Sequence, residues 1–374
     1  MESIIYVGMD VHKDSYSLCC YDPKRNLFFS EMQIKSETKN VIKYLEHVLE
    51  MNDGAITLSC YEAGPTGFRL CRELQKKGFA CVVMAPTSIA KSAKDRLVKT
   101  DRADARMLAK VLAAKQYKEV VLPTEHVESI KEIVRLRVNV HKACKRAKQN
   151  LLSFLLNQGF HYPDGGSNKY WTKNFFEWLK TINFASDYLQ YCFEEYLSEV
   201  TRQIQRLSLM DKKLKELEDD KEIAAGVRKL RCICGIDTIV AVGLVAEVGD
   251  FKRFSTAEKF ASYTGLCPGR HSSGLSDRSR GITKQGNRYL RKLLVEAAKS
   301  VKRTAPHGKK SKRLIARQEG SSTEIINYAD KAGKRIRNKM ERLERRGVSY
   351  NKATAACARE LACFVWGMMT GNIA

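Results

Sequence analysis

Four carboxylates stand where strands are expected to end and a helix to begin. Asp10 closes the apolar run SIIYVGMD, and Glu62 closes AITLSCYE. Asp101 and Asp104 are three residues apart in VKTDRADARMLAK, so on a helix they share one face. Acids at neighbouring strand ends repel each other unless a cation lies between them. Such hard oxygen ligands suit Mg²⁺ or Mn²⁺, which assist phosphodiester cleavage.

Each acid taken alone also has an ordinary structural interpretation. Asp10 fits a turn cap, Asp101 fits a helix N-cap, and Asp104 fits the first helical turn. Convergence of the set on one site is therefore what favours the metal-binding interpretation.

A second reactive group lies in the stretch CPGRHSSGLSDRSRG, residues 267–281. It sets two serines, Ser272 and Ser273, just before Gly274. One histidine and three arginines surround them: His271, Arg270, Arg278 and Arg280. The stretch predicts a flexible loop. Two interpretations of the serines are open. One of them is a nucleophile that attacks a phosphate held by the arginines, or the hydroxyls form hydrogen bonds with the backbone of their own turn. The residues themselves do not choose between the two serines, and His271 fits a phosphate contact or the surface better than a base.

The charge of the chain indicates a polyanionic partner. Its 374 residues carry 66 Lys and Arg against 42 Asp and Glu, a net charge of +24. Residues 299–346 alone hold 16 basic against 5 acidic residues. Such an excess favours nucleic acid over a membrane surface. The longest apolar run, residues 239–248, is too short to span a bilayer, and the first residues do not resemble a signal peptide, so we expect a cytoplasmic protein.

The cysteines predict no metal site. Twelve of them are scattered along the chain, and the spacing of Cys232 and Cys234 does not suit a zinc knuckle. We expect them to be reduced thiols that pack in the protein interior.

Alternating strand and helix signals in the first 122 residues predict the elements that position the acids. Strands are expected over residues 3–11, 15–22, 26–34, 55–63 and 79–86, with helices over 38–52, 66–78 and 88–114. This pattern predicts an α/β domain with a mixed sheet. The order strand-Asp, strand-Glu, helix-Asp-x-x-Asp is similar to that of an RNase H-like nuclease core.

The rest of the chain is expected to be mainly helical, with a cap at Asp237 or Thr238 beginning one helix. An apolar stripe from Phe193 to Leu217 recurs at steps of three and four residues. It predicts either self-association as a coiled coil or packing within its own bundle. Three aromatic residues nearby fit core packing better than stacking on unpaired bases: Tyr170, Trp171 and Phe175.

Several motifs together resemble one known family. VGMDVHKDS, YEAGPTG and KTDRADARMLA are similar to the DEDD motifs of the insertion-sequence one-ten transposases, which include the Piv-type DNA invertases. GLCPGRHSSG, followed by RGITKQGNRYLRKLLVEAA, is similar to that family's C-terminal signature. The resemblance covers nearly the whole chain with the motifs in order, although the helical middle matches in character only.

The resemblance implies three domains. Residues 1–122 would be a RuvC-like, RNase H-like catalytic domain of α/β class. Residues 123–222 would form a helical coiled-coil region for RNA binding and oligomerisation. Residues 223–374 would form a mainly α C-terminal transposase domain that carries the catalytic serine.

The resemblance also implies roles for individual residues. Asp10, Glu62, Asp101 and Asp104 match the DEDD site that binds Mg²⁺ or Mn²⁺, and Ser273 matches the serine that forms a phosphoserine–DNA intermediate. Five basic residues of the signature would contact nucleic acid: Arg270, Arg278, Arg280, Lys284 and Arg288.

The partners implied by the resemblance are double-stranded donor and target DNA and a structured non-coding bridge RNA that guides their choice. The protein would form a homo-oligomer, from dimer to tetramer, in which acids and serine come from different subunits. We expect it to act near the bacterial nucleoid without a membrane partner. Three alternatives stay open: a RuvC-like junction nuclease with no covalent step, a site-specific DNA invertase, and a non-catalytic nucleic-acid-binding protein.

Overall fold

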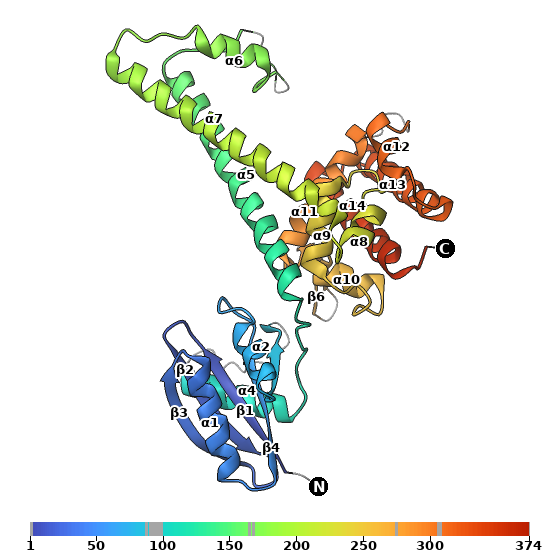
Figure 1. The fold of residues 1–374 in the computed structure, drawn as a ribbon. Coiled ribbons are helices and arrows are strands. Elements are labelled where there is room, and N and C mark those ends of the chain that lie inside the picture. The colour runs from blue at the N-terminus through green and yellow to red at the C-terminus, as the bar shows by residue number, and fades with distance from the viewer. Residues whose placement is uncertain are drawn as a thin grey trace. The chain divides into compact units, whose positions relative to one another are not determined.

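Two compact units make up the chain, Met1–Leu122 and Pro123–Ala374, which run from blue to cyan and from green to red in Figure 1. The computed structural model describes residues 3–86, 89, 100–163, 166, 169–273, 276–304 and 309–373. For residues 270–273, 276–280 and 302–304 it describes the backbone alone. Each unit has hydrophobic clusters of its own.

The N-terminal unit is built on one five-stranded sheet of order β3-β2-β1-β4-β5. Strands β1, β2 and β3 pair antiparallel, whereas β1, β4 and β5 pair parallel. The predicted mixed α/β architecture is thereby confirmed. In chain order the elements are β1 (Ser3–Val11), β2 (Ser15–Asp22), β3 (Leu27–Lys35), α1 (Thr38–Glu50), β4 (Ala55–Glu62), α2 (Arg69–Lys76), β5 (Ala80–Met84) and α4 (Asp101–Ala113).

The alternation of side chains along β1 separates the two faces of this sheet. Ile5, Val7 and Met9 belong to the buried cluster that includes residues of α1 and α2. Tyr6 instead packs in the cluster that contains Leu108 of α4. Helices α1 and α2 therefore cover one face of the sheet, and α4 covers the other.

Gly8 permits the close approach of α4 to β1. A Cβ atom on Gly8 would lie 2.0 Å from the Ala105 carbonyl oxygen and 2.5 Å from the Ala109 nitrogen. Both atoms belong to the helix backbone, so a side chain at this position cannot be accommodated by a rotamer change. The absence of a Cβ here lets α4 carry its acids close to the end of β1.

Gly8→Ala is expected to destabilise the N-terminal unit by about 2–3 kcal/mol, because α4 must move away from the sheet. Urea unfolding of the full-length protein measures this loss. Gly64→Ala is the matched control, since a Cβ there would meet nothing closer than 3.8 Å. Equal unfolding midpoints for the two variants would show that α4 does not pack as described.

Helix α4 begins at Asp101, so the expected helix over residues 88–114 is not continuous. Thr100 is extended, with φ −134° and ψ 143°, which interrupts it. The Thr100 hydroxyl accepts a hydrogen bond from the Ala103 N–H. Thr100, and not Asp101, is therefore the N-cap, which places Asp101 and Asp104 in the first turn. Residues 87, 88 and 90–99 lie outside the described part of the chain.

The C-terminal unit is mainly helical, as predicted. Asp237 caps α9 through a 2.8 Å hydrogen bond from the Val240 N–H, which confirms the expected helix start. The helices are α5 (Glu125–Asn157), α6 (Lys173–Lys180), α7 (Asp187–Glu216), the 3₁₀ turn Leu217–Asp219, α8 (Ala224–Leu230), α9 (Thr238–Val248), α10 (Ala257–Tyr263), α11 (Arg288–Thr304), α12 (Lys312–Gln318), α13 (Thr323–Arg345) and α14 (Tyr350–Thr370).

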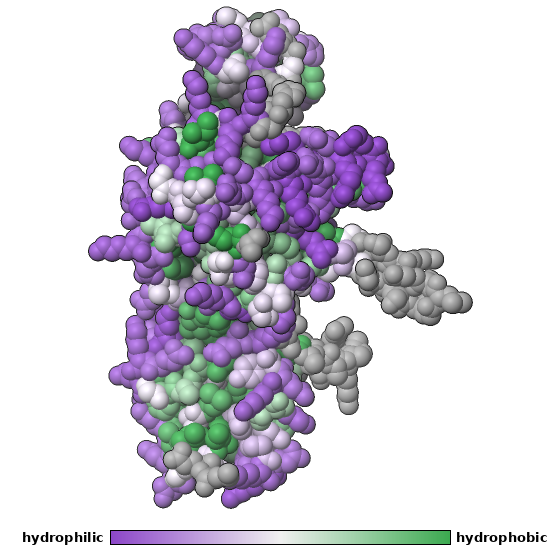
Figure 2. All heavy atoms as spheres, turned by 90° about the vertical axis from the view of Figure 1, so that its right-hand side faces the viewer, coloured by the Kyte–Doolittle hydropathy of each residue, from purple (hydrophilic) through white to green (hydrophobic). Residues whose placement is uncertain are grey.

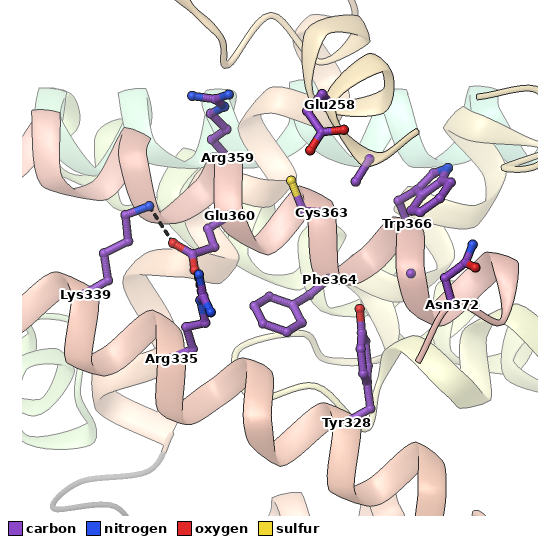
Figure 3. Close-up of a pocket in the computed structure, with 12 residues that line it drawn as sticks. Glu258, Tyr328, Arg335, Lys339, Arg359, Glu360, Cys363, Phe364, Trp366 and Asn372 are labelled. Atoms are coloured by element: carbon purple, nitrogen blue, oxygen red, sulfur yellow. Dashed lines mark hydrogen bonds and ion pairs between the residues drawn. The ribbon is translucent and has the colours of Figure 1, made fainter. Parts of the chain in front are cut away.

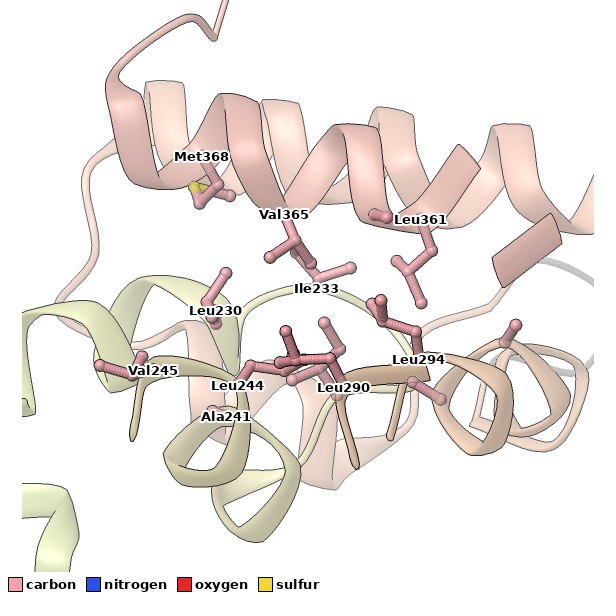
Figure 4. Close-up of a cluster of buried hydrophobic side chains, with 14 of the residues drawn as sticks. Leu230, Ile233, Ala241, Leu244, Val245, Leu290, Leu294, Leu361, Val365 and Met368 are labelled. Atoms are coloured by element: carbon pink, nitrogen blue, oxygen red, sulfur yellow. The ribbon is translucent and has the colours of Figure 1, made fainter. Parts of the chain in front are cut away.

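The C-terminal helix α14 closes the main core of this unit. Leu361 and Val365 of α14 are buried over Leu244 of α9 and Leu294 of α11 (Figure 4). The first part of α5 also joins this core, for example through Ile130. Burial of apolar surface at about 25 cal/mol per Å² makes such a layer the main stabilising contact between these helices.

The apolar stripe of α7 packs partly within its own unit. Phe193 and Val200 are buried in a cluster with Leu151 and Leu155 of α5. Self-association through the remainder of the stripe stays a prediction. The division of residues 123–374 into two domains also stays one.

The aromatic residues around α6 fill the same cluster. Phe175 is fully buried, and the Trp171 ring centroid lies 5.0 Å from that of Phe175. Tyr170 packs against the cluster as well. Core packing is therefore confirmed for Phe175, and base stacking by this residue is wrong.

The structure bears on two expectations from composition, the state of the cysteines and the presence of membrane-spanning helices. All twelve cysteines are free thiols, and most of them are buried, as expected for packing residues. In the described part of the chain no helix is long and apolar enough to cross a membrane. Hydrophilic side chains cover much of the face in Figure 2, with hydrophobic patches among them.

Candidate metal centre and serine hairpin

The ends of β1 and β4 bring the first two acids together. Met9 pairs with Tyr61 in the parallel register, so Asp10 and Glu62 are the next residues on neighbouring strands. Cys60 packs in the cluster beneath α4, and alternation places Glu62 on that same face. The predicted adjacency of these two strand ends is thus confirmed by the sheet register.

The first turn of α4 carries the other two acids to the same edge. Asp101 and Asp104 are both in this turn, where the positive end of the helix dipole favours negative charge. Gly8 faces α4 two residues before Asp10, so Asp10 shares that face. The Asp10 carboxylate senses the charges of both helix acids, which contribute to its shifted pKa.

His12 completes the cluster and was not predicted from the sequence. Its Nε2 lies 3.1 Å from Oδ2 of Asp10 and 3.7 Å from Oδ1 of Asp101. The signal was present, because residues two apart at a strand end face the same side. A single histidine after an acid has many surface interpretations, however, and only the position of α4 reveals its role.

The electrostatics of Asp10 are those of a site that lacks enough positive charge. Burial raises the pKa of the Asp10 carboxyl, and repulsion by Asp104 and Asp101 raises it further, while His12 acts in the opposite direction. The Asp10 side chain is only 18% exposed. A bound cation would offset both the burial and the repulsion.

The donor set fits a divalent cation. Among the described residues, Asp10, His12 and Asp101 form a group whose ligand atoms all lie within 4.8 Å of one another. Carboxylate oxygens suit Mg²⁺ and Mn²⁺, and an imidazole nitrogen is a better ligand for Mn²⁺ than for Mg²⁺. The geometry therefore supports a divalent metal without fixing which one.

His12→Ala is expected to weaken Mn²⁺ binding by about 10- to 100-fold, because an imidazole that holds a ligand carboxylate in place is lost. Mn²⁺ titration followed by electron paramagnetic resonance measures this directly. His47→Ala, an exposed change on α1, is the control within the same unit. Unchanged Mn²⁺ affinity in His12→Ala would exclude His12 from the site.

The serine stretch is a hairpin and not the flexible loop that was expected. Strands β6 (Pro268–Ser273) and β7 (Ser276–Ile282) pair antiparallel, with Ser272 opposite Asp277 and Ser273 opposite Ser276. Pairing of the two strands joins backbone groups and does not need an apolar face, so this polar, arginine-rich sequence can form it. Gly274 and residue 275 lie outside the part of the chain that the structure describes.

The side chains of the predicted hairpin residues fall outside the part that the structure describes. The backbone of β6 carries Arg270, His271, Ser272 and Ser273, and that of β7 carries Arg278 and Arg280. Their roles therefore stay predictions.

The last two predicted contacts are described in full. Lys284 is exposed and has a left-handed backbone with φ 57°. Arg288 opens α11, is exposed and lies over the Tyr289 ring, 4.9 Å from its centroid. Both side chains are accessible to a ligand.

Comparison with known proteins defines the class. A family model described as a DEDD transposase of IS110 matches residues 7–160, and a model for transposases of the IS116/IS110/IS902 family matches residues 227–313. Both models describe transposases, which are enzymes that cut and rejoin DNA.

Individual relatives extend over the whole chain. The y4qE protein of Sinorhizobium fredii is 32% identical, over 97% of this chain and 88% of its own length. The transposase for insertion sequence element IS1533 of Leptospira borgpetersenii is 31% identical, over 92% of this chain and 98% of its own. The chain therefore belongs to the IS110/IS116 family of insertion-sequence transposases, which confirms the family resemblance.

Proposed function

We propose that this transposase cuts and rejoins donor and target DNA by metal-assisted serine attack. The observation that carries the proposal is the convergence of Asp10, Asp101 and Asp104 at one sheet edge, with Glu62 at the next strand end. The strand order and the placement of these acids support an RNase H-like, RuvC-like fold for the N-terminal unit.

The four acids and His12 would hold one or two divalent cations. A bound cation supplies positive charge that stabilises the transferring phosphoryl group. Asp10, whose side chain is less exposed than that of His12, would bind the cation, while His12 would fix the orientation of its carboxylate. The first turn of α4 would contribute its two carboxylates to the same site.

Ser273 would supply the nucleophile. Its Oγ forms a bond to phosphorus as the bond from phosphorus to one sugar oxygen breaks. The serine proton leaves, and the departing sugar oxygen takes up a proton, so the step is balanced. The reverse attack by a sugar hydroxyl on the phosphoserine rejoins DNA and frees the serine.

The acids and Ser273 lie in different units of the chain, and the family resemblance implies that they act together across subunits. We therefore propose an oligomer, from dimer to tetramer, assembled on DNA. A structured guide RNA would choose the donor and target by base pairing, while the protein contributes charge and shape. We place this activity in the bacterial cytoplasm near the nucleoid.

A guide-exchange experiment tests the proposal. Purified protein is incubated with Mg²⁺, the element's flanking non-coding RNA, and donor and target DNA, and the guide loops of the RNA are then replaced. We expect the recombination site to follow the new loops and EDTA to stop the reaction. A target choice that ignores the loops would remove the guide RNA from the account.

The junction-nuclease alternative requires the acids alone. It predicts cleavage with no protein–DNA adduct. An invertase would act on a fixed segment and leave the element in place. A non-catalytic binding protein predicts that removing the Asp10 carboxylate leaves every phenotype intact.

A further inference from the structure

Helix α13 is amphipathic, and its outer side is strongly cationic. Ala332, Ile336 and Met340 are buried against the core. The outer side lines a groove beside α14. Among the described residues that line this groove, the acidic ones are Glu341 and Glu360. Six basic residues line the same groove: Lys331, Lys334, Arg335, Lys339, Arg342 and Arg345. We call this the α13–α14 groove.

The carboxylates of the groove neutralise only part of this charge. The Glu360 carboxylate of α14 forms ion pairs with both Lys339 and Arg335 of α13 (Figure 3). Burial alone would raise the pKa of Glu360, but hydrogen bonds from these two cations lower it. Glu360 is therefore ionised at neutral pH and is already occupied by two partners.

The remaining cations are placed to receive an external anion. Within the described residues, no carboxylate pairs with Lys334, Arg342 or Arg345, although other basic side chains of this unit do have partners. Arg137, for example, donates to Asp211 at 2.6 Å. Like charges repeated along one helix repel each other, and a bound polyanion relieves that repulsion.

The groove continues to the base of the serine hairpin. A second hollow is lined by Pro268 and Gly281, one from each hairpin strand, and no carboxylate is among its described lining residues. Its cations are Lys284, Lys339, Lys352 and Arg359. Lys339 lines both hollows, so one basic path runs from α13 to the hairpin.

We propose that the α13–α14 groove binds the phosphate backbone of the DNA duplex that Ser273 cuts. This inference rests on the proposed function, because it takes the hairpin serine to act on DNA. Because the groove leads to the hairpin base, it is placed to hold the strand that the serine attacks. The predicted contact Lys284 becomes the link between the two.

The length of β6 sets where the contacts should fall. At about 3.3 Å per residue, Ser273 lies at most about 17 Å along the strand from Pro268. Successive phosphates of one strand are about 3.4 Å apart along the duplex axis. The hairpin base should therefore contact phosphates within about five nucleotides of the cut, and the α13–α14 groove should contact the phosphates that follow.

The salt dependence of DNA binding tests this inference. The groove variant carries Lys334→Gln, Arg342→Gln and Arg345→Gln in the full-length protein. Binding to a labelled duplex of the element end is measured by anisotropy from low to high salt. Each lost phosphate contact lowers the slope of log affinity against log salt by about 0.9, so we expect a loss of up to about 2.7.

A matched control removes the same charge elsewhere. Lys24→Gln, Lys43→Gln and Lys77→Gln change three exposed residues of the N-terminal unit, and the slope should fall far less. Binding to the guide RNA is measured in parallel with both variants. Melting temperatures verify that the exposed substitutions leave the fold intact.

The outcomes separate the inference from its rivals. A lower DNA slope in the groove variant alone supports it. An unchanged DNA slope overturns it, and so does a loss confined to RNA, which would make the groove an RNA site.

Methylphosphonates placed one at a time along the strand provide the test of position. Those just beyond the five phosphates nearest the cut should weaken the wild type but not the groove variant, and equal interference with both proteins at these positions overturns the inference. An assay for a covalent protein–DNA adduct, on denaturing gels, is scored separately with wild-type protein. Its failure, with the slope still lowered, would overturn serine attack while leaving the groove as a DNA site.

Discussion

Asp10→Asn is expected to lower DNA strand cleavage by about two to three orders of magnitude while DNA binding persists. The change keeps the shape of the side chain and removes the charge that holds the cation. Cleavage of labelled donor DNA with saturating Mg²⁺ measures the loss. Asp14→Asn, in the exposed turn between β1 and β2, is the matched control and should cut like the wild type.

The same variant has an expected effect on stability of definite sign. Burial and repulsion raise the pKa of Asp10 in the folded protein, so ionisation of this group disfavours folding as pH rises. Without divalent cations, Asp10→Asn should therefore melt at or above the temperature of the wild type at neutral pH. Added Mn²⁺ should then stabilise only the wild type. Full cleavage by Asp10→Asn would remove the acidic cluster from the chemistry.

Ser273→Ala is expected to abolish strand exchange and the protein–DNA adduct, because the only attacking oxygen is removed. Ser272→Ala, one residue earlier on β6, is the closest control and should retain most of the activity. Denaturing gels with end-labelled donor DNA measure both products. If loss followed Ser272→Ala instead, the assignment would move by one residue with the rest of the mechanism intact.

Folding and melting of the serine variants must match the wild type for this comparison to be valid. Ser273 lies at the last pair of the hairpin, opposite Ser276, and alanine keeps the backbone groups that form this pair. Metal binding at the N-terminal unit should be unaffected by either change, because the serines belong to the other unit. A serine variant that loses Mn²⁺ binding would contradict the assignment of the metal site to the N-terminal unit and of the serine to the C-terminal unit.

The four acids were predictable because each stands at the end of a segment with clear periodicity. Asp10 and Glu62 end apolar strands, and the spacing of Asp101 and Asp104 is helical. The sheet then needed only parallel pairing of β1 with β4 to bring the first two together. His12 was missed because its role depends on where α4 lies, which no local pattern encodes.

Other features escaped prediction for similar physical reasons. The serine hairpin is held by backbone pairing between polar strands, so the hydrophobic pattern that indicates strands was absent. The interruption of the predicted helix at Thr100 was missed because a threonine N-cap is difficult to recognise among residues that all tolerate helix. The α13–α14 groove joins residues from two helices, and only packing of α14 against α13 creates it.

The most direct test of the account is the identity of the residue that is joined to DNA. Protein, guide RNA, Mg²⁺ and donor DNA are trapped under denaturing conditions, digested with nuclease and protease, and analysed by tandem mass spectrometry. The account predicts a nucleotide joined through phosphate to Ser273, and no such peptide from Asp10→Asn protein. DNA that is cut efficiently while no serine carries a nucleotide would contradict it, and the acids would then act with water alone.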